Sequence, residues 1–223
     1  MTVTEAVRRR RSIRAFLPTP VSEATLREVL DTARWAPSGS NVQAWKIIAV
    51  AGAERDAVVS MALGSMGTPS LANHDEFPVY PPNLWEPLRT RRFALAEDMY
   101  RALGIPREDK PARLRHVARN FELFDAPVGL FFILDRRVAH GQWAHLGMLI
   151  QTVALLLEER GLGCCMQEAW AQFRPQLAER FGLPPEEMVY CGMAVGHPDL
   201  AKPVNDFPRD RISVDELTQF RGF

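Results

Sequence analysis

The stretch WAHLGMLIQTVALLL, residues 143–157, constrains the fold most, because it is apolar around nearly its whole helical circumference. It is shorter than the roughly 20 residues of a membrane span, and it contains His145, Gln151 and Thr152. Charged residues follow it, and then Gly161, a residue typical of the position after a helix end. A helix of this kind is buried on all sides. The sequence therefore predicts a central core helix, whose surface also suits a subunit interface.

The composition excludes several classes of protein. A length of 223 residues, with 47% hydrophobic and 24% charged residues, is ordinary for a globular domain. The 27 basic residues balance 27 acidic ones, whereas nucleic-acid-binding domains usually carry a basic surplus. Cys164, Cys165 and Cys191 form no disulfide framework and suit a reducing compartment. We therefore expect a cytoplasmic protein with no nucleic-acid or membrane partner, and the N-terminus lacks the apolar run of a secretory signal.

Helical and strand patterns both occur, which indicates an α+β protein with a single domain over residues 1–223. Helices are predicted over 2–10, 21–36, 88–103 and 107–122, and buried strands over 45–52, 127–135 and 189–196. Ser22 is the expected N-cap of the second helix. Residues 64–87 have no period and form a long loop, typical of lids and binding loops. The segment 197–223 contains three prolines and SVDELTQF, which predicts an extended arm with one helical turn.

The sequence has no set of residues that would carry out chemistry without a cofactor. Its five histidines have no metal-ligand spacing with each other or with the cysteines. Neither GxGxxG nor GxxxxGK[ST] occurs, and no GxSxG turn or Ser-His-Asp set is present. We therefore predict no metal site and no catalytic side chain, so that an enzyme of this sequence would take its reactive group from a cofactor.

Four polar segments could form a binding site. RRRRSIRAF (8–16) and FPRDRI (207–212) supply arginines, while APSGSNVQAW (36–45) and GLGCCMQEAW (161–170) supply amide and hydroxyl groups. Taken singly, each has a plainer interpretation: a helix end in solvent, a helix C-cap with its turn, or a solvated face. Together they describe a site for one anionic group and one polar ring system.

The order of these motifs resembles the FMN-dependent nitroreductase superfamily, and in particular a bacterial branch of nitroaromatic reductases. RRRSIRAF is followed by APSGSNVQAWKI, then GLGCCMQEAW, then GHPDLAKPVNDFPRDR, and the similarity extends from about residue 8 to the C-terminus. The resemblance implies a nitroreductase-like fold with a central mixed β-sheet flanked by helices. It also implies an intertwined homodimer in which each C-terminal arm (197–223) wraps the other subunit, with FMN at the interface.

The resemblance also implies a role for individual residues. Phosphate and ribityl contacts fall on Arg10, Arg11, Ser12, Arg14, Arg209 and Arg211. Flavin contacts from the neighbouring subunit fall on Pro37, Ser38, Ser40, Asn41 and Gln43. The loop whose backbone N–H faces flavin N5 falls on Met166, Gln167, Glu168 and Ala169. Arg8 and Arg9 are not covered by the resemblance and are expected to end a helix in solvent.

The activity implied by the resemblance is transfer of electrons from NAD(P)H through FMN to nitroaromatic or quinone acceptors, by a ping-pong mechanism. Residues 64–122 would form a lid over the flavin, with Phe77, Tyr80 and Trp85 stacking on flat acceptors. Arg119 and Asn120 are the candidate polar groups of the pocket. Since the sequence points no other charged group at a substrate carboxylate or ammonium, we expect broad acceptor specificity.

Other functions remain open at this stage. A reductive dehalogenase of the iodotyrosine type is the nearest alternative, but its lid Glu, four residues before a Tyr, is Ala96 before Tyr100 here. Flavin destruction to make the lower cobalamin ligand is a second possibility within the superfamily. A nucleic-acid-binding module is a third, and it predicts a colourless protein with salt-sensitive affinity for DNA.

Overall fold

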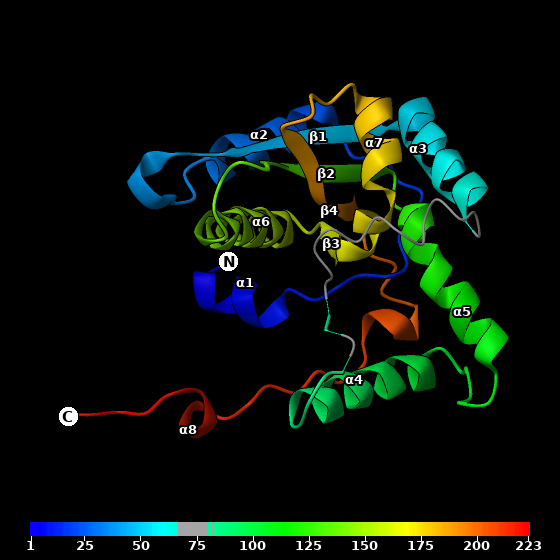
Figure 1. Ribbon diagram of the computed structural model, residues 1–223. Helices are drawn as coiled ribbons and strands as arrows, with labels where there is room; N and C mark the ends of the chain where they lie inside the picture. Colours follow the sequence, from blue (N-terminus) through cyan, green and yellow to red (C-terminus); the bar gives the residue numbers. More distant parts are fainter. Residues whose placement is uncertain (67–79, 82) are drawn as a thin grey trace.

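A four-stranded sheet with helices packed on both faces forms the centre of the molecule, so the predicted α+β class is confirmed (Figure 1). The computed structural model describes residues 1–66, 80–81 and 83–223. The strands are β1 (Trp45–Ala51), β2 (Val128–Asp135), β3 (Gly163–Gln167) and β4 (Glu187–Gly196), in the order β1-β2-β4-β3. These strands pair antiparallel, and among the described residues parallel pairing is limited to a bridge between Ser12 and Cys164.

The helices surround this sheet. The α-helices are α1 (Val3–Arg9), α2 (Glu23–Ala33), α3 (Gly52–Ser65), α4 (Leu88–Ala102), α5 (Lys110–Ala118), α6 (Gly141–Glu159), α7 (Arg174–Phe181) and α8 (Val214–Leu217). Short 3₁₀ turns are η1 (Gly39–Asn41), η3 (Arg119–Asp125), η4 (Glu168–Phe173) and η5 (Pro203–Asn205). Figure 1 shows α6 beneath the sheet, α1 below α6, and α4 with the C-terminal arm lower still.

The alternation of side chains along β2 builds the two cores. Leu130, Phe132 and Leu134 pack with residues of α2 and α6, whereas Phe131 and Ile133 pack with residues of α3 and α7. Successive strand residues point to opposite faces of a sheet, so a strand covered on both faces is apolar throughout. This explains why the run PVGLFFILD has no polar alternation and why every β2 residue before Asp135 is buried.

Helix α6 is only partly covered by its own chain, so the prediction that it is buried on all sides is wrong for one subunit. Leu149, Val153 and Leu157 are buried against the core, but Met148 is 45% exposed and Gly147 is also exposed. In the described part of this chain, no element covers these exposed residues of α6. We call this side of the helix its open face. Among the described residues, no helix has both the length and the apolar character required to cross a bilayer.

Three elements are absent from the sequence-based prediction, namely α3, β3 and α7, and the helix expected over 107–122 ends at Ala118. It gives way to η3, in which Leu123 and Phe124 are buried with positive φ angles of 54° and 52°. The Arg55 side chain donates hydrogen bonds to the carbonyls of Glu122 (2.7 Å) and Ala126 (3.2 Å). Burial of these two side chains and the hydrogen bonds from Arg55 therefore stabilise a backbone shape that local helix propensity opposes.

The C-terminal arm leaves the body of the molecule after η5. Residues 210–223 are exposed, including Leu217 at 70% and Phe220 at 61%. The predicted helical turn is α8, which Ser213 caps by accepting a hydrogen bond from Glu216 N (3.1 Å). Figure 1 shows this arm passing α4 and ending away from the sheet. An exposed apolar arm suits binding to another surface.

Candidate functional site

Six arginines from three distant segments line one cavity of about 250 Å³, which we call the arginine cavity. Arg10, Arg11 and Arg14 come from the N-terminal stretch, Arg92 from α4, and Arg209 and Arg211 from the arm. Ser12 and Asn205 also line it, and no acidic side chain is among the described lining residues. The two arginine segments of the sequence therefore meet as predicted. Such a concentration of guanidinium groups is typical of a site for a multiply charged anion.

Asn205, which the sequence-based prediction missed, joins the N-terminal stretch to the arm. It is 2% exposed, and its Oδ1 accepts a hydrogen bond from Arg14 N (2.7 Å). Its Nδ2 donates to the carbonyls of Ala15 (2.8 Å) and Asp199 (2.9 Å). All the polar groups of this buried side chain are thus used, which holds the two segments in one register. The quoted motif KPVNDFPRD contains Asn205, but nothing local marks it as more than a turn residue.

Two of the arginines also support the walls of the cavity. Arg209 donates to the carbonyls of Arg8, Arg9 and Arg10 at the C-terminal end of α1. These carbonyls lack helical partners, and a cation is favoured beside them. Arg11 pairs with Asp206 and also donates to the Asn205 carbonyl (3.0 Å). Arg9 lies outside the cavity in an ion pair with Glu158 (3.0 Å), in agreement with its expected role at a helix end.

The crowded positive charge perturbs the titration of Arg209. Burial lowers the pKa of its guanidinium, and the charges of Arg11, Arg10 and Arg211 lower it further. This mutual repulsion would be relieved by an anion in the cavity, since each arginine would then gain an opposite charge.

A second cavity, of about 790 Å³, lies beside the open face of α6, and we call it the ring cavity. Its lining combines α6 with the end of β3 and the start of η4, while α5 contributes Val117 and η3 contributes Asn120. Predicted residues that line it are Met166, Gln167, Glu168, Ala169, Tyr80 and Asn120. Arg92 lines both cavities, so the two adjoin at its side chain. The resulting site has a cationic end and a long, partly apolar end.

The turn after β3 is rigid. Gln167 is 2% exposed, donates from Nε2 to the Asn120 carbonyl (2.7 Å), and accepts from Trp170 Nε1 (3.3 Å). A side chain at Gly192 would place its Cβ 2.5 Å from Trp170 Cδ1, so the ring of Trp170 requires glycine there. The backbone of Glu168 and Ala169 is therefore presented to the ring cavity from a well-packed support.

Two titratable groups of the ring cavity are shifted by their surroundings. Burial raises the pKa of the Glu168 carboxyl above its ordinary value. Burial also raises the pKa of the Tyr190 hydroxyl, and the nearby charge of Glu168 adds to this effect. Both shifts are in the direction that partial burial gives to an acid, because burial disfavours the charged form.

The turn at residues 38–43 lies outside both cavities. Ser40, Asn41 and Gln43 have positive φ angles of 51°, 57° and 50°, and all three are exposed. Ser38 Oγ accepts from Gln43 N (3.0 Å), and His145 Nδ1 on α6 accepts from Gly39 N (3.4 Å). Figure 1 shows the connection between α2 and β1 projecting beyond the end of α6. Pro37, Ser38, Ser40, Asn41 and Gln43 are thus not brought to the cavities of their own chain.

The remaining predicted pocket residues divide into three cases. Arg119 is engaged by Asp125 and by Glu122 (3.6 Å), and it lines neither cavity. Trp85 is 62% exposed and also lines neither. The prediction for Phe77 falls outside the described residues. Arg92 and Tyr190 are pocket residues that sequence reasoning missed, since nothing local separates Arg92 from the other arginines of α4.

The fold and the two cavities define a class of protein: an α+β domain in which converging arginines line one cavity beside a second, partly apolar one. Comparison with known proteins then identifies the family. The model of the nitroreductase family matches residues 7–197, and the chain belongs to this family.

Individual relatives cover nearly the whole chain. The chain is 35% identical over 98% of its length to a nitrobenzene nitroreductase of Ectopseudomonas oleovorans, of which 96% is covered. It is 34% identical over 96% of its length to a 4-nitrobenzoate reductase of Pseudomonas putida, of which 93% is covered. Its structure matches an FMN- and NADPH-dependent nitroreductase NfnB of Sphigopyxis sp. strain HMH with a TM-score of 0.93 and 38% identity, over 100% of both chains.

Proposed function

We propose that this protein is an FMN-dependent oxidoreductase that transfers electrons from NAD(P)H to nitroaromatic or quinone acceptors in a ping-pong mechanism. The observation that carries the proposal is the arginine cavity, without an acidic lining residue, joined through Arg92 to the ring cavity. Relatives named for nitrobenzene, 4-nitrobenzoate, FMN and NADPH support the reaction class.

The residues present fit FMN. The phosphate dianion matches the open guanidinium donors of Arg10, Arg14 and Arg211, with Ser12 beside them and with Arg11 and Arg209 supporting the wall. The flat ring system matches the ring cavity between α6 and the turn at Met166, Gln167, Glu168 and Ala169. Bound FMN supplies hydride transfer at its N5 atom, so the chain needs no catalytic side chain of its own.

The chain's own contribution is to bind, orient and exclude water. Glu168 and Ala169, on the turn after β3, line the ring cavity, and backbone N–H donors there would stabilise negative charge that develops on a bound ring. The α4–α5 part of the 64–122 segment acts as a roof, with Tyr80 available for stacking. Donor and acceptor would use the same cavity in turn, which is the physical basis for the ping-pong order.

We infer that the functional unit is a homodimer of single-domain subunits (1–223). Three features support this: the open face of α6, the exposed end of the arm at 210–223 with apolar side chains such as Leu217 and Phe220, and the strained, exposed turn at 38–43. An arm that wraps the partner and a turn that reaches the partner's flavin would account for all three. The three free, buried cysteines suit a reducing compartment, and we place the protein in the cytoplasm.

The colour of the purified protein tests the proposal. We expect a yellow protein that NADH or NADPH bleaches under anaerobic conditions, and whose colour returns on addition of a nitroarene. A colourless protein that cannot be loaded with FMN would overturn the assignment. Sedimentation provides a second test, because dissociation into monomers should release the flavin; a flavin-loaded monomer contradicts the dimer proposal.

A further inference from the structure

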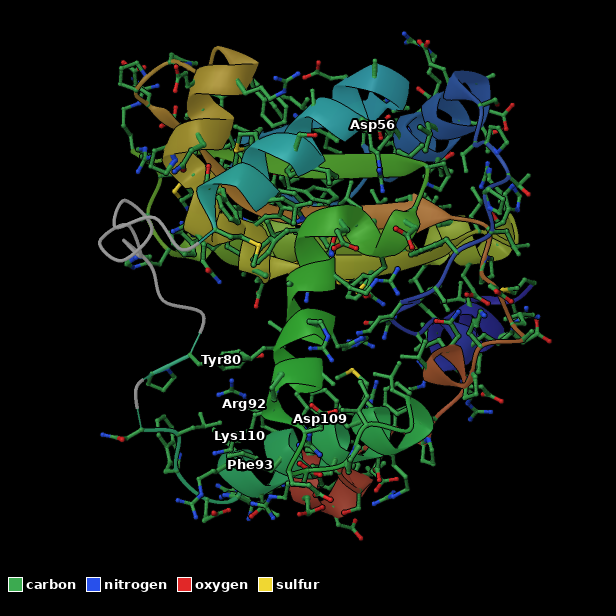
Figure 2. The ribbon with its side chains drawn as sticks, turned by 90° about the vertical axis from the view of Figure 1, so that its right-hand side faces the viewer. Asp56, Tyr80, Arg92, Phe93, Asp109 and Lys110 are labelled. Carbon is green, nitrogen blue, oxygen red and sulfur yellow. The ribbon has the colours of Figure 1, made fainter. Side chains whose placement is uncertain are left out.

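Arg92, in the second turn of α4, lies at the boundary between the arginine cavity and the ring cavity and lines both. Its Cζ atom lies 4.0 Å from the centroid of the Tyr80 ring. Figure 2 shows the two side chains next to each other, Tyr80 on the segment that leads to α4 and Arg92 on α4 itself. Arg92 is therefore a cation positioned at the edge of the site proposed for flat acceptors.

The other arginines of α4 are neutralised by carboxylates. Arg89 pairs with Glu86 (3.2 Å), Arg91 with Glu216 (3.4 Å) and Arg101 with Asp98 (2.5 Å). Within the part of the chain that the structure describes, Arg92 has no such partner and contacts the face of an aromatic ring instead. Arg92 is thus the arginine of α4 whose charge is not balanced by a carboxylate among the described residues, and it is also the one that lines the cavities.

The contact with Tyr80 positions the guanidinium without using its hydrogen-bond donors. A cation over a ring face is held by the ring quadrupole, while the N–H groups of the guanidinium lie in its own plane. Those N–H groups form a fork that matches the two oxygens of a carboxylate. Arg92 consequently offers a preformed site for a planar oxyanion.

The location of Arg92 between the two cavities indicates which anion it would bind. The arginine cavity already has five other arginines for the phosphate, whereas the ring cavity has Arg92 alone among its described arginines. Arg119, the arginine that the sequence suggested for this role, is occupied by Asp125 and Glu122. An acceptor lying flat in the ring cavity would therefore meet one free guanidinium at the rim.

We propose that Arg92, held over the ring of Tyr80, is a specificity-determining residue that binds the carboxylate of an aromatic acid in the ring cavity. The inference rests on the proposed function and refines it. It replaces the expectation of broad specificity by a preference for acceptors that carry a carboxylate over neutral acceptors of the same shape and reduction potential. A neutral nitroarene would still be reduced, because stacking and electron transfer do not require Arg92.

The test compares 4-nitrobenzoate with 4-nitrobenzamide, a neutral analogue of nearly the same shape, on the FMN-loaded enzyme. We expect Arg92→Met to lower the ratio of kcat/KM for the acid over the amide by about tenfold, the size of one lost charge-assisted hydrogen-bonded contact. Arg92→Lys keeps the positive charge but lacks the forked N–H donors, so its acid-to-amide ratio should fall between those of the wild type and Arg92→Met. Rates are expressed per bound FMN, since Arg92 also lines the arginine cavity.

Arg91→Met is the matched control, because Arg91 lies on the same helix but pairs with Glu216 and lines neither cavity. It should leave the acid-to-amide ratio unchanged. Tyr80→Phe should also preserve the ratio, whereas Tyr80→Leu should lower it, since only the leucine variant removes the aromatic face under Arg92.

A binding measurement separates this inference from the proposed function. Benzoate should perturb the flavin absorbance of the oxidised enzyme with an affinity that falls about tenfold in Arg92→Met, while the affinity for benzamide stays constant. An unchanged acid-to-amide ratio in an active, FMN-loaded Arg92→Met enzyme overturns the inference and leaves the proposed function intact. A rise in the KM for NADPH but not for NADH, together with an unchanged acid-to-amide ratio, also overturns the inference, because Arg92 would then bind the phosphate of the donor. An FMN-loaded protein that reduces neither acceptor overturns the proposed function itself.

Discussion

The arginine cavity and the turn at residues 38–43 are both parts of the proposed flavin site, but they are built in opposite ways. In the arginine cavity, a buried asparagine and arginine–carbonyl contacts fix the walls within one chain. In the turn, three exposed residues hold left-handed backbone conformations, supported by hydrogen bonds at the surface such as that from Gln43 N to Ser38 Oγ. Backbone strain of this kind persists where surrounding structure stabilises it.

We infer from this difference that the two subunits of the proposed homodimer contribute different parts of each flavin site. Bringing like charges together is unfavourable, so the donors for an anion must be fixed before it binds, and one chain does this alone. The proposed ring site, in contrast, is a surface that one chain leaves open, beside the exposed part of α6. We expect changes in the arginine cavity to abolish flavin binding directly, and changes in the turn to have smaller effects.

The largest effect is expected from Asn205→Ala. This change leaves Arg14 N without its acceptor, at about 1–3 kcal/mol for an unsatisfied buried group, and removes one of two hydrogen bonds from each of the carbonyls of Ala15 and Asp199. We expect loss of FMN on purification and a lower free energy of unfolding, measured by absorbance and by urea denaturation. Retention of full FMN with unchanged stability would contradict the role given to Asn205.

Arg211→Ala should weaken FMN binding by about 10- to 100-fold, because it removes a charge-assisted contact to the phosphate. Arg8→Ala is the control, since the exposed Arg8 side chain lines neither cavity. Arg209→Ala should differ from both by destabilising the fold as well, through the carbonyls at the end of α1. Flavin dissociation constants from fluorescence titration, with thermal denaturation alongside, distinguish the three. Equal flavin affinity for Arg211→Ala and Arg8→Ala would refute the phosphate site.

The third prediction concerns His116, whose ring packs between those of Tyr100 and Phe124. Burial, together with the charges of Arg14 and Arg119, lowers its pKa from 6.5 to about 4, and its Nε2 is buried without a partner among the described residues. The unfolded chain binds a proton more readily, so this stability is present above pH 6.5 and is lost as the pH falls toward 4.

We therefore expect His116→Phe to remove up to about 3 kcal/mol of acid destabilisation between these two pH values. The measurement is the free energy of unfolding at pH 7 and pH 4.5, with the exposed His140→Gln as the control. If wild type and His116→Phe lose the same stability on acidification, His116 is not a neutral buried group.

The smallest effect is expected in the turn. Ser40→Gly relieves the positive φ angle of 51°, while glycine costs conformational entropy in the unfolded state. The net gain should be about 1 kcal/mol or less, which corresponds to a rise of about 2–4 °C or less in Tm. Differential scanning calorimetry of the apoprotein measures it. A large loss of stability would instead show that the Ser40 side chain supports the fold within its own chain.

Local signals in the sequence predicted much of the fold. Ser22 caps α2 as expected, accepting a hydrogen bond from Thr25 N (3.0 Å), and the apolar runs at β1, β2 and β4 are strands. These features depend on residues a few positions apart, so the sequence contains them directly. Strand β3 was missed because GCCMQ is short and only its packing explains it: a Cβ at Gly163 would lie 2.6 Å from Ile13 Cγ1.

The sequence by itself determined the residue types, the order of the four polar segments and, through them, the family. Only the tertiary structure decided which arginines serve a ligand and which serve the fold. Arg91 and Arg92 are adjacent and chemically identical, yet one pairs with Glu216 and the other faces the cavities. Arg209 contacts carbonyls of α1 near the other end of the chain. Whether a charge is neutralised depends on partners that are distant in sequence, and only folding brings those partners together.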